Sequence, residues 1–300
     1  MSYPKHSKTE FFKYTSASTA INILETATVR YSSPLLFNDP FDIQSGLHFD
    51  FDILAFPDTV LNRIRQLVES EQAPELVLHE PMGQIISLMR EKKTTHGTPE
   101  QVLQGILLPF LSSLRDDLIN LQIEYQNGWR NFLPRLRVFS VSEEKDNLLL
   151  WAHYGESHTG VAFEFLVLPQ EDNPLCVAEP VIYSQDPPSL HTQEEWVNET
   201  LGIHELDHDK LYFRYAYVKS DVWAYEKEWR VWDLKSEPDD RLFSDYPLIP
   251  KEVGSVYLGC KIKPEHKSSI ISLISQKYPW VNVYQAKKAD TKFKLEFQQL

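Results

Sequence analysis

The stretch from Trp223 to Trp232 constrains the fold more than any other part of the sequence. It is rich in aromatic residues, yet Glu226, Glu228 and Arg230 interrupt it at alternate positions. Alternate residues of a β-strand share one face, so the pattern predicts a strand with a charged face toward a cleft and a mostly apolar face on a core. The alternative is an arginine–carboxylate pair that only ties a sheet together.

Length and composition indicate a globular protein. The chain has 300 residues, of which 42% are hydrophobic and 12% aromatic, with only 10 glycines and 19 prolines. A chain of this kind buries a substantial core and is neither fibrous nor of low complexity. Cys176 and Cys260 lie far apart and form neither a disulfide framework nor a zinc pair, which predicts a reducing compartment.

Charge and hydropathy limit the partners that we expect. Thirty basic against 43 acidic residues give a net charge of -13, which disfavours nonspecific attraction to nucleic acid or an anionic membrane. The first six residues hold no apolar signal core, and no apolar run approaches the roughly 20 residues that span a bilayer. We expect a soluble cytoplasmic protein with a small-molecule or nucleotide ligand in a central cleft and no membrane partner. The net charge disfavours a nucleic-acid partner but leaves a local basic groove open.

Hydrophobic periodicity predicts an α+β fold with a mixed, largely antiparallel sheet. A strand, a helix and a second strand follow one another near the start of the chain, and strand, helix and strand recur near its end. The expected strands are 10–16, 28–33, 136–142, 161–165, 180–183, 253–258, 280–286 and 293–297. The expected helices are 20–25, 148–154, 194–217 and 264–277.

Residues 52–131 have a different, helical texture. Apolar residues recur there at intervals of three and four in 59–69, 82–92 and 99–120, and prolines separate these segments. The pattern predicts a helical cap inserted into a single domain that spans residues 1–300. Before it, the run from Leu35 to Asp42 predicts a rigid loop, with a solvated turn as the alternative for Asp39 and Asp42.

One short motif points to a metal. The segment His204-Glu205-Leu206-Asp207-His208 has the H-E-x-x-H spacing, in which two histidines on one helical turn bind zinc and the glutamate activates water. Asp207 and Asp209 favour the alternative of an acidic surface helix, so the favoured reading has no metal.

The ordered motifs together resemble DUF2971, a bacterial family of unknown function. They begin with Phe12-Lys13-Tyr14-Thr15-Ser16 and extend nearly to the end of the chain. Members of the family often have an arginine where this chain has Thr15, which weakens an anion-binding role for the first strand. The other motifs are Ser33-Pro34, 37–42, 139–142, 146–154 with Gly160, 223–230 and 256–259.

The layout also resembles that of ADP-ribosyltransferases, in which NAD lies across a split sheet. That resemblance implies an α+β enzyme in which a late-strand glutamate stabilises positive charge on the ribose as nicotinamide leaves. It also implies that Tyr154 or Trp151 stacks on nicotinamide. The implied cofactor-binding residues are Tyr14, Thr15, Asn38, Trp151 and Tyr154, and the implied catalytic residues are Glu228, Glu226, Arg230 and Ser142.

Glu228 is the preferred catalytic carboxylate, with Arg230 as a phosphate or carboxylate clamp, because an arginine keeps a neighbouring carboxylate ionised. Two other functions stay open. One is a zinc hydrolase that uses His204, Glu205 and His208. The other is a binding module whose aromatic residues, Trp151, Tyr154 and Trp229, line a recognition pocket without turnover.

Overall fold

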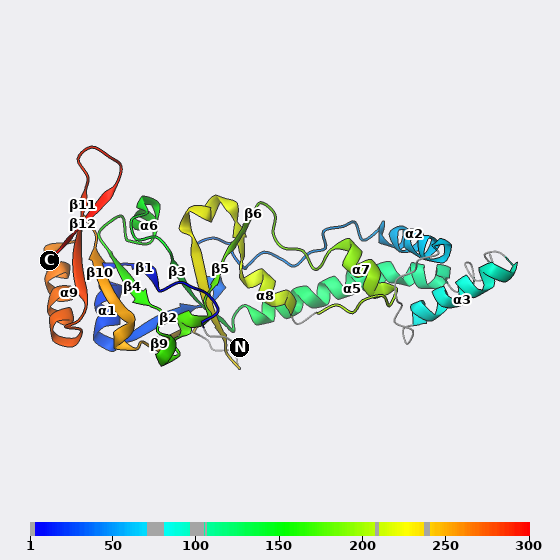
Figure 1. Cartoon of the computed structure of the whole chain (residues 1–300), viewed down its shortest axis with the longest axis horizontal. Coiled ribbons are helices and arrows are strands. Elements are labelled where there is room, and N and C mark those ends of the chain that lie inside the picture. Colours follow the sequence, from blue (N-terminus) through cyan, green and yellow to red (C-terminus); the bar gives the residue numbers. More distant parts are fainter. Residues whose placement is uncertain (1–3, 71–80, 97–104, 106, 208–209, 237–240) are drawn as a thin grey trace. The chain divides into compact units, whose positions relative to one another are not determined.

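The computed structural model (Figure 1) describes residues 4–70, 81–96, 105, 107–207, 210–236 and 241–300. The chain divides into two compact units. The first unit comprises Met1–Gln44, Leu133–Asp186 and Tyr217–Leu300, and the second comprises Ser45–Phe132 and Pro187–Ala216. Each unit therefore brings together segments that are remote in the sequence.

A ten-stranded sheet forms the centre of the first unit. Its main path runs β12-β11-β10-β4-β1-β3-β2-β9, and β8 pairs with both β3 and β5. Strands β10 and β11 are parallel, whereas the other pairs are antiparallel, so the predicted α+β fold with a mixed, largely antiparallel sheet is confirmed. The strands are β1 (Glu10–Thr15), β2 (Thr28–Ser32), β3 (Leu136–Ser142), β4 (Val161–Leu166), β5 (Glu179–Pro180), β8 (Glu228–Leu234), β9 (Phe243–Pro247), β10 (Val253–Leu258), β11 (Asn282–Lys288) and β12 (Leu295–Gln299).

The sheet splays on both sides of β3. Strand β1 pairs with β4 along its whole length. Its pairing with β3 is limited to one position, where Phe12 lies opposite Ser142. Strand β2 likewise meets β3 at Ser32 opposite Val138, although it pairs with β9 along its whole length. Because β1 and β2 diverge from β3, side chains rather than backbone hydrogen bonds line the space between them.

Alternation along β1 places its side chains in two separate cores. Phe11 packs in a core with helices α1 (Ala17–Thr26) and α9 (Pro264–Lys277). Phe12 and Tyr14 point to the opposite face, where they pack with α6 (Leu148–His153). Helix α1 begins where the Ser16 side chain accepts a hydrogen bond from the Thr19 backbone N–H, an N-cap that satisfies one free donor.

The Trp223–Trp232 stretch is not one continuous strand, contrary to the sequence prediction. Residues Asp221–Glu226 form a 3-10 helix, η5, and β8 starts only at Glu228. Between them Lys227 has a φ of 43°, in the left-handed region that strands do not use. Glu228 and Arg230 therefore share a strand face as predicted, but Glu226 belongs to the preceding turn of helix.

The expected helix over 194–217 is also interrupted. It consists of α7 (Gln193–Thr200) and α8 (Lys210–Ala216). Gly202 follows α7 with a φ of 67°, which ends a helix at low cost because glycine has no Cβ. A further small sheet, of parallel strands β6 (Ile182–Ser184) and β7 (Val218–Ser220), belongs to the first unit.

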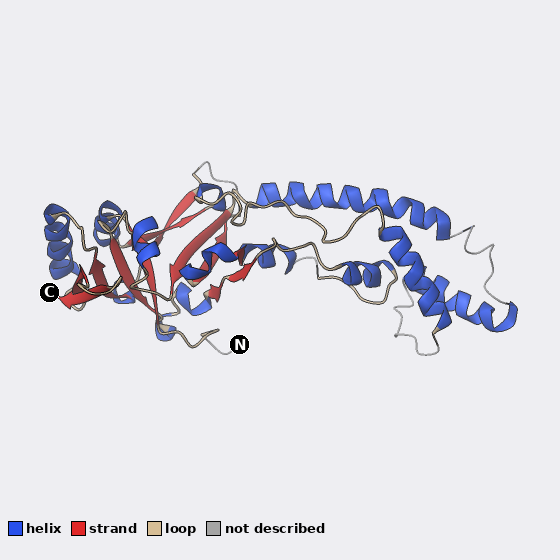
Figure 2. Cartoon of the chain, turned by 90° about the horizontal axis from the view of Figure 1, so that it is seen from above, coloured by secondary structure: helices blue, strands red, loops and turns tan. Residues whose placement is uncertain are grey.

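Helices dominate the second unit, in which Figure 2 shows no red strand among the described residues. Besides α7 and α8 it contains α2 (Phe56–Glu69), α3 (Pro81–His96) and α5 (Leu108–Phe132). The unit contains the predicted insertion 52–131, and residues 187–216 join it. The single-domain organisation stays a prediction. Within the described ranges, no helix is both long and apolar enough to cross a membrane.

Candidate functional site

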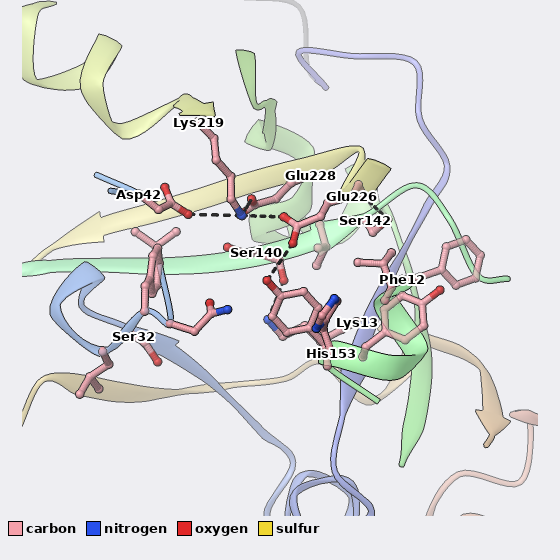
Figure 3. Close-up of a pocket in the computed structure, with 18 of the residues that line it drawn as sticks. Phe12, Lys13, Ser32, Asp42, Ser140, Ser142, His153, Lys219, Glu226 and Glu228 are labelled. Atoms are coloured by element: carbon pink, nitrogen blue, oxygen red, sulfur yellow. Dashed lines mark hydrogen bonds and ion pairs between the residues drawn. The ribbon is translucent and has the colours of Figure 1, made fainter. Parts of the chain in front are cut away.

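A pocket of about 400 Å³ lies in the first unit, where β1 and β2 diverge from β3. Strand residues form its floor, while the loop after β2, the end of α6 and the segment around η5 form its walls. Figure 3 shows several of these side chains pointing toward one another. The lining residues are Phe12, Lys13, Tyr14, Arg30, Ser32, Leu36, Phe37, Asn38, Asp42, Val138, Ser140, Val141, Ser142, Leu150, His153, Tyr154, Lys219, Glu226 and Glu228.

Five buried charged residues, Asp42, Lys219, Glu226, Glu228 and Arg230, form a connected group that we call the charged cluster. Lys219 Nζ lies 2.6 Å from Glu226 Oε2, 3.0 Å from Glu228 Oε2 and 3.4 Å from Asp42 Oδ2 (Figure 3). Arg230 donates from Nη2 to both oxygens of Asp42, at 2.8 and 2.7 Å. Its Nε donates to Glu228 Oε1 at 2.7 Å. Segments about 190 residues apart thus meet at one guanidinium.

The local backbone explains why the carboxylates on both sides of Lys227 reach the charged cluster. The left-handed Lys227 turns the chain, so Glu226 at the end of η5 and Glu228 at the start of β8 contact the same Lys219. The lysine comes from the edge strand β7. The Glu228 backbone N–H donates to the Tyr183 hydroxyl at 2.8 Å, which fixes the start of β8 against β6.

The carboxylates of the charged cluster differ in their electrostatics. Burial would raise the pKa of Glu228, but Arg230 and Lys219 hold it below its usual range. For Glu226, burial outweighs Lys219 and raises the pKa. Burial also raises the pKa of Asp42, despite Arg230. Glu228 is therefore the carboxylate most firmly held in its ionised form.

The charged cluster by itself has a formal negative charge. Three carboxylates face two cations, which leaves one formal negative charge in excess when all are ionised. Half-buried Lys13 lines the same pocket and donates from Nζ to the Ser140 carbonyl oxygen at 2.7 Å. Burial lowers its pKa to about 8, although Glu228 and Glu226 favour its charged form. Lys13, when charged, offsets this excess, so the negative charge that a ligand would meet lies at the carboxylates of the charged cluster themselves.

Glu226 has more free acceptor capacity than Glu228. Its Oε1 accepts from the Tyr154 hydroxyl at 2.8 Å and its Oε2 accepts from Lys219. The two oxygens of Glu228 accept from both Arg230 and Lys219, and also from the Ser140 hydroxyl. Since an ionised carboxylate has about four acceptor sites, Glu226 is better placed to accept a hydrogen bond from a ligand.

Six of the nine residues singled out from the sequence line the pocket: Tyr14, Asn38, Ser142, Tyr154, Glu226 and Glu228. Arg230 lies behind the lining and holds Asp42 and Glu228. Thr15 and Trp151 are not among the described lining residues. Trp151 is fully buried, and its indole N–H donates to the Lys145 carbonyl oxygen at 2.9 Å, while Thr15 pairs with Val161 in the sheet.

The family comparison matches the part of the chain that supplies most of this cluster. The model of a family described as a protein of unknown function, DUF2971, matches residues 150–231. Over these residues the chain is similar to the DUF2971 family. No curated protein and no solved structure matches it.

The DUF2971 match runs from the middle of α6 into β8, so it includes Tyr154, Lys219, Glu226, Glu228 and Arg230. The earlier motifs, in β1 and in the loop after β2, lie outside the matched residues. The structure brings those motifs to the same pocket, however. The resemblance to ADP-ribosyltransferases stays a prediction.

The H-E-x-x-H segment does not lie on a helix where it is described. Residues 202–207 form turns and irregular backbone, and His208 lies outside the described residues. The helix that both the zinc site and the acidic-surface alternative assume is therefore not found at residues 202–207. Within the described ranges no group of three or more histidine, cysteine, aspartate or glutamate side chains is arranged to hold a metal ion.

Sequence reasoning missed two members of the charged cluster. The sequence gives Asp42 no role beyond a rigid loop or a solvated turn, but Asp42 is 4% exposed and pairs with Arg230 and Lys219. Lys219 was not singled out at all. The sequence does mark Lys219, because it is the one lysine in the otherwise β-prone and aromatic run 215–225. A buried lysine requires carboxylate partners, but the sequence does not say which ones.

Proposed function

We propose that this protein is an NAD-using enzyme of ADP-ribosyltransferase type that cleaves the bond between nicotinamide and ribose in the β1–β3 pocket. One observation carries the proposal. Tyr14, Ser142, Tyr154 and Glu228, which come from the early, middle and late motifs, line a single pocket. Its volume of about 400 Å³ is in the range of roughly 300–1,000 Å³ for small-molecule sites.

The electrostatics of the pocket suit this reaction. When the bond between ribose C1′ and the pyridinium nitrogen breaks, its electron pair leaves with nicotinamide and positive charge develops on the sugar. An oxygen nucleophile, from water or an acceptor hydroxyl, then forms the new bond to C1′ and loses its proton. Fixed carboxylates beside the sugar stabilise the developing charge without reorganising. Glu228, which Arg230 and Lys219 keep ionised in the lining of the pocket, supports this role.

The two glutamates have different parts in the proposed reaction. Glu226 faces the ligand and accepts from a ribose hydroxyl, because its oxygens have the freer acceptor positions. Glu228 was preferred from the sequence; its bonds to Arg230 and Lys219 make it the fixed, ionised charge behind Glu226. Ser142 is a positioning residue, since its hydroxyl donates to the Glu226 carbonyl oxygen at 2.6 Å.

The experiment measures nicotinamide released from NAD by purified protein. We expect the Glu226→Gln variant to release nicotinamide about 100-fold more slowly than the wild type, because one preorganised charge in an active site contributes roughly 10²- to 10³-fold. Glu228→Gln is also expected to slow release. The exposed Glu171, which lies outside the pocket, provides the control Glu171→Gln, with an unchanged rate.

Two results contradict the proposal. One is a wild-type protein that neither binds NAD in calorimetry nor releases nicotinamide. The other is release at the wild-type rate by both glutamine variants.

A second candidate, a binding module without turnover, is favoured by one observation. Each carboxylate of the charged cluster is already paired with Lys219 or Arg230, as structural ion pairs are. Under this alternative the pocket binds NAD or a related ligand and returns it intact. Calorimetry that shows saturable binding, together with full recovery of NAD by chromatography, distinguishes the module from the enzyme.

A further inference from the structure

A second cavity, of about 540 Å³, lies beneath the hairpin that joins β11 and β12. The hairpin turn is held by its own backbone, since the Ala289 N–H donates to the Lys294 carbonyl oxygen at 3.0 Å and the Lys294 N–H donates to the Lys292 carbonyl oxygen at 2.8 Å. The other walls come from the start of α6, the loop at His158 and the turn after β10. None of its lining residues lines the β1–β3 pocket.

The lining of this cavity is basic, although the chain carries a net charge of -13. Four lysines line it, Lys261, Lys288, Lys292 and Lys294, against one carboxylate, Asp290. In the part of the chain that the structure describes, none of the four side chains forms an ion pair. All four lysines are exposed, so solvent screens their mutual repulsion, and the attraction of an anion comes from the positive charge that they gather around one hollow.

Because side chains alternate along β11, Lys288 lies on the face of the strand that lines the cavity and Lys287 lies on the other face. Ala286 of β11 is buried in the core beside α6, and Lys288 lies two residues later on the same face. Lys287, on the opposite face, is paired across the strands with Glu296 and does not line the cavity. The basic lining is thus a property of one face of the hairpin.

A histidine in the wall adds a second, independent observation. The Nδ1 atom of His158 is buried and has no hydrogen-bond partner within the described ranges. Burial, and then Lys261, lower the pKa of His158, so the neutral ring prevails. Nδ1 has no accessible surface, so a ligand oxygen would instead meet the part of the ring that lines the cavity, where the N–H of a neutral imidazole can donate.

We propose that the cavity under the β11–β12 hairpin binds a phosphate-bearing small molecule, whose phosphate oxygens contact the four lysines and His158. A chain of linked phosphates fits this lining better than a single carboxylate does, since several cations surround the hollow and each lysine binds phosphate as a compact point charge. This site is separate from the proposed NAD reaction and does not depend on it.

The experiment is calorimetric titration of the full chain with inorganic tripolyphosphate, and then with ATP. We expect saturable binding of both anions, weakened at least tenfold in the triple variant K288Q/K292Q/K294Q. The matched control is K251Q/K263Q/K287Q, which removes the same charge from exposed lysines outside the cavity. We expect the control to change affinity less than twofold, with both variants keeping the thermal stability of the wild type.

Three results would overturn the proposal. They are no saturable binding of either anion to the wild type, unchanged affinity in the cavity variant, and equal weakening in both triple variants. The last result would mean that overall charge, and not this cavity, attracts the anion. Nicotinamide release from NAD by the cavity variant tests the separate site, so the two proposals fail independently.

Discussion

At the scale of single residues, Arg230 joins two carboxylates of the candidate site that are remote in the sequence. It is fully buried and contacts both Asp42 and Glu228. Removing one partner of a buried ion pair leaves uncompensated charge in a poorly solvated place, which costs more than the pair itself contributes. Arg230 is thus a positioning residue for the carboxylate that it keeps ionised.

We expect Arg230→Met to lower the free energy of unfolding by about 3–5 kcal/mol, because it leaves Asp42 and Glu228 buried without their guanidinium. The measurement is urea denaturation at pH 7. The control is Arg30→Met, since the Arg30–Asp245 pair is roughly half exposed. Its loss should cost at most about 1 kcal/mol. Equal losses in the two variants would mean that the charged cluster is no more important to stability than a surface pair.

At the scale of elements, the short 3-10 helix η6 (Pro250–Glu252) ends in a buried titratable residue, Glu252, directly before β10. Glu252 is 6% exposed, and burial raises its pKa to about 7, although Asn173 and the Ile249 backbone N–H stabilise the ionised form. The folded state therefore holds a proton that the unfolded chain releases near pH 4.5. By linkage, this group lowers stability as pH rises from about 4.5 to about 7.

Glu252→Gln keeps the shape of the side chain but cannot ionise. We expect the wild type to lose more stability than this variant between pH 5 and pH 8, because only the wild type must charge a buried carboxylate. Denaturation at a series of pH values measures the difference. Exposed Glu171→Gln should retain the wild-type profile. Parallel profiles for wild type and Glu252→Gln would show that Glu252 does not titrate in this range.

Local patterns predicted many elements well. Strands 136–142 and 253–258 and helix 264–277 have the predicted bounds, because alternation, helical spacing and proline at a helix start are local signals. The break at Lys227 was missed, since a left-handed lysine leaves no compositional mark. Strand β9 was missed because it is short and gains its partners from β2, which is about 215 residues earlier.

At the scale of the whole molecule, the site depends on which remote segments meet, and periodicity does not encode this. The sequence motifs predicted that Tyr14, Ser142, Tyr154 and Glu228 would share a cleft, and all four line one pocket. The pairing of Asp42 with Arg230 was not predicted, nor was the basic cavity under the last hairpin. Net charge averages over the chain and so conceals a local basic lining.

The measurement that tests the central claim most directly is acetylation of Lys13 at pH 8, followed by mass spectrometry, with and without NAD. Lys13 lines the pocket, and its lowered pKa of about 8 makes its amine reactive at this pH. If the pocket binds NAD, labelling of Lys13 falls as NAD is added, whereas labelling of exposed Lys251 does not change. Labelling of Lys13 that is indifferent to saturating NAD would contradict the account.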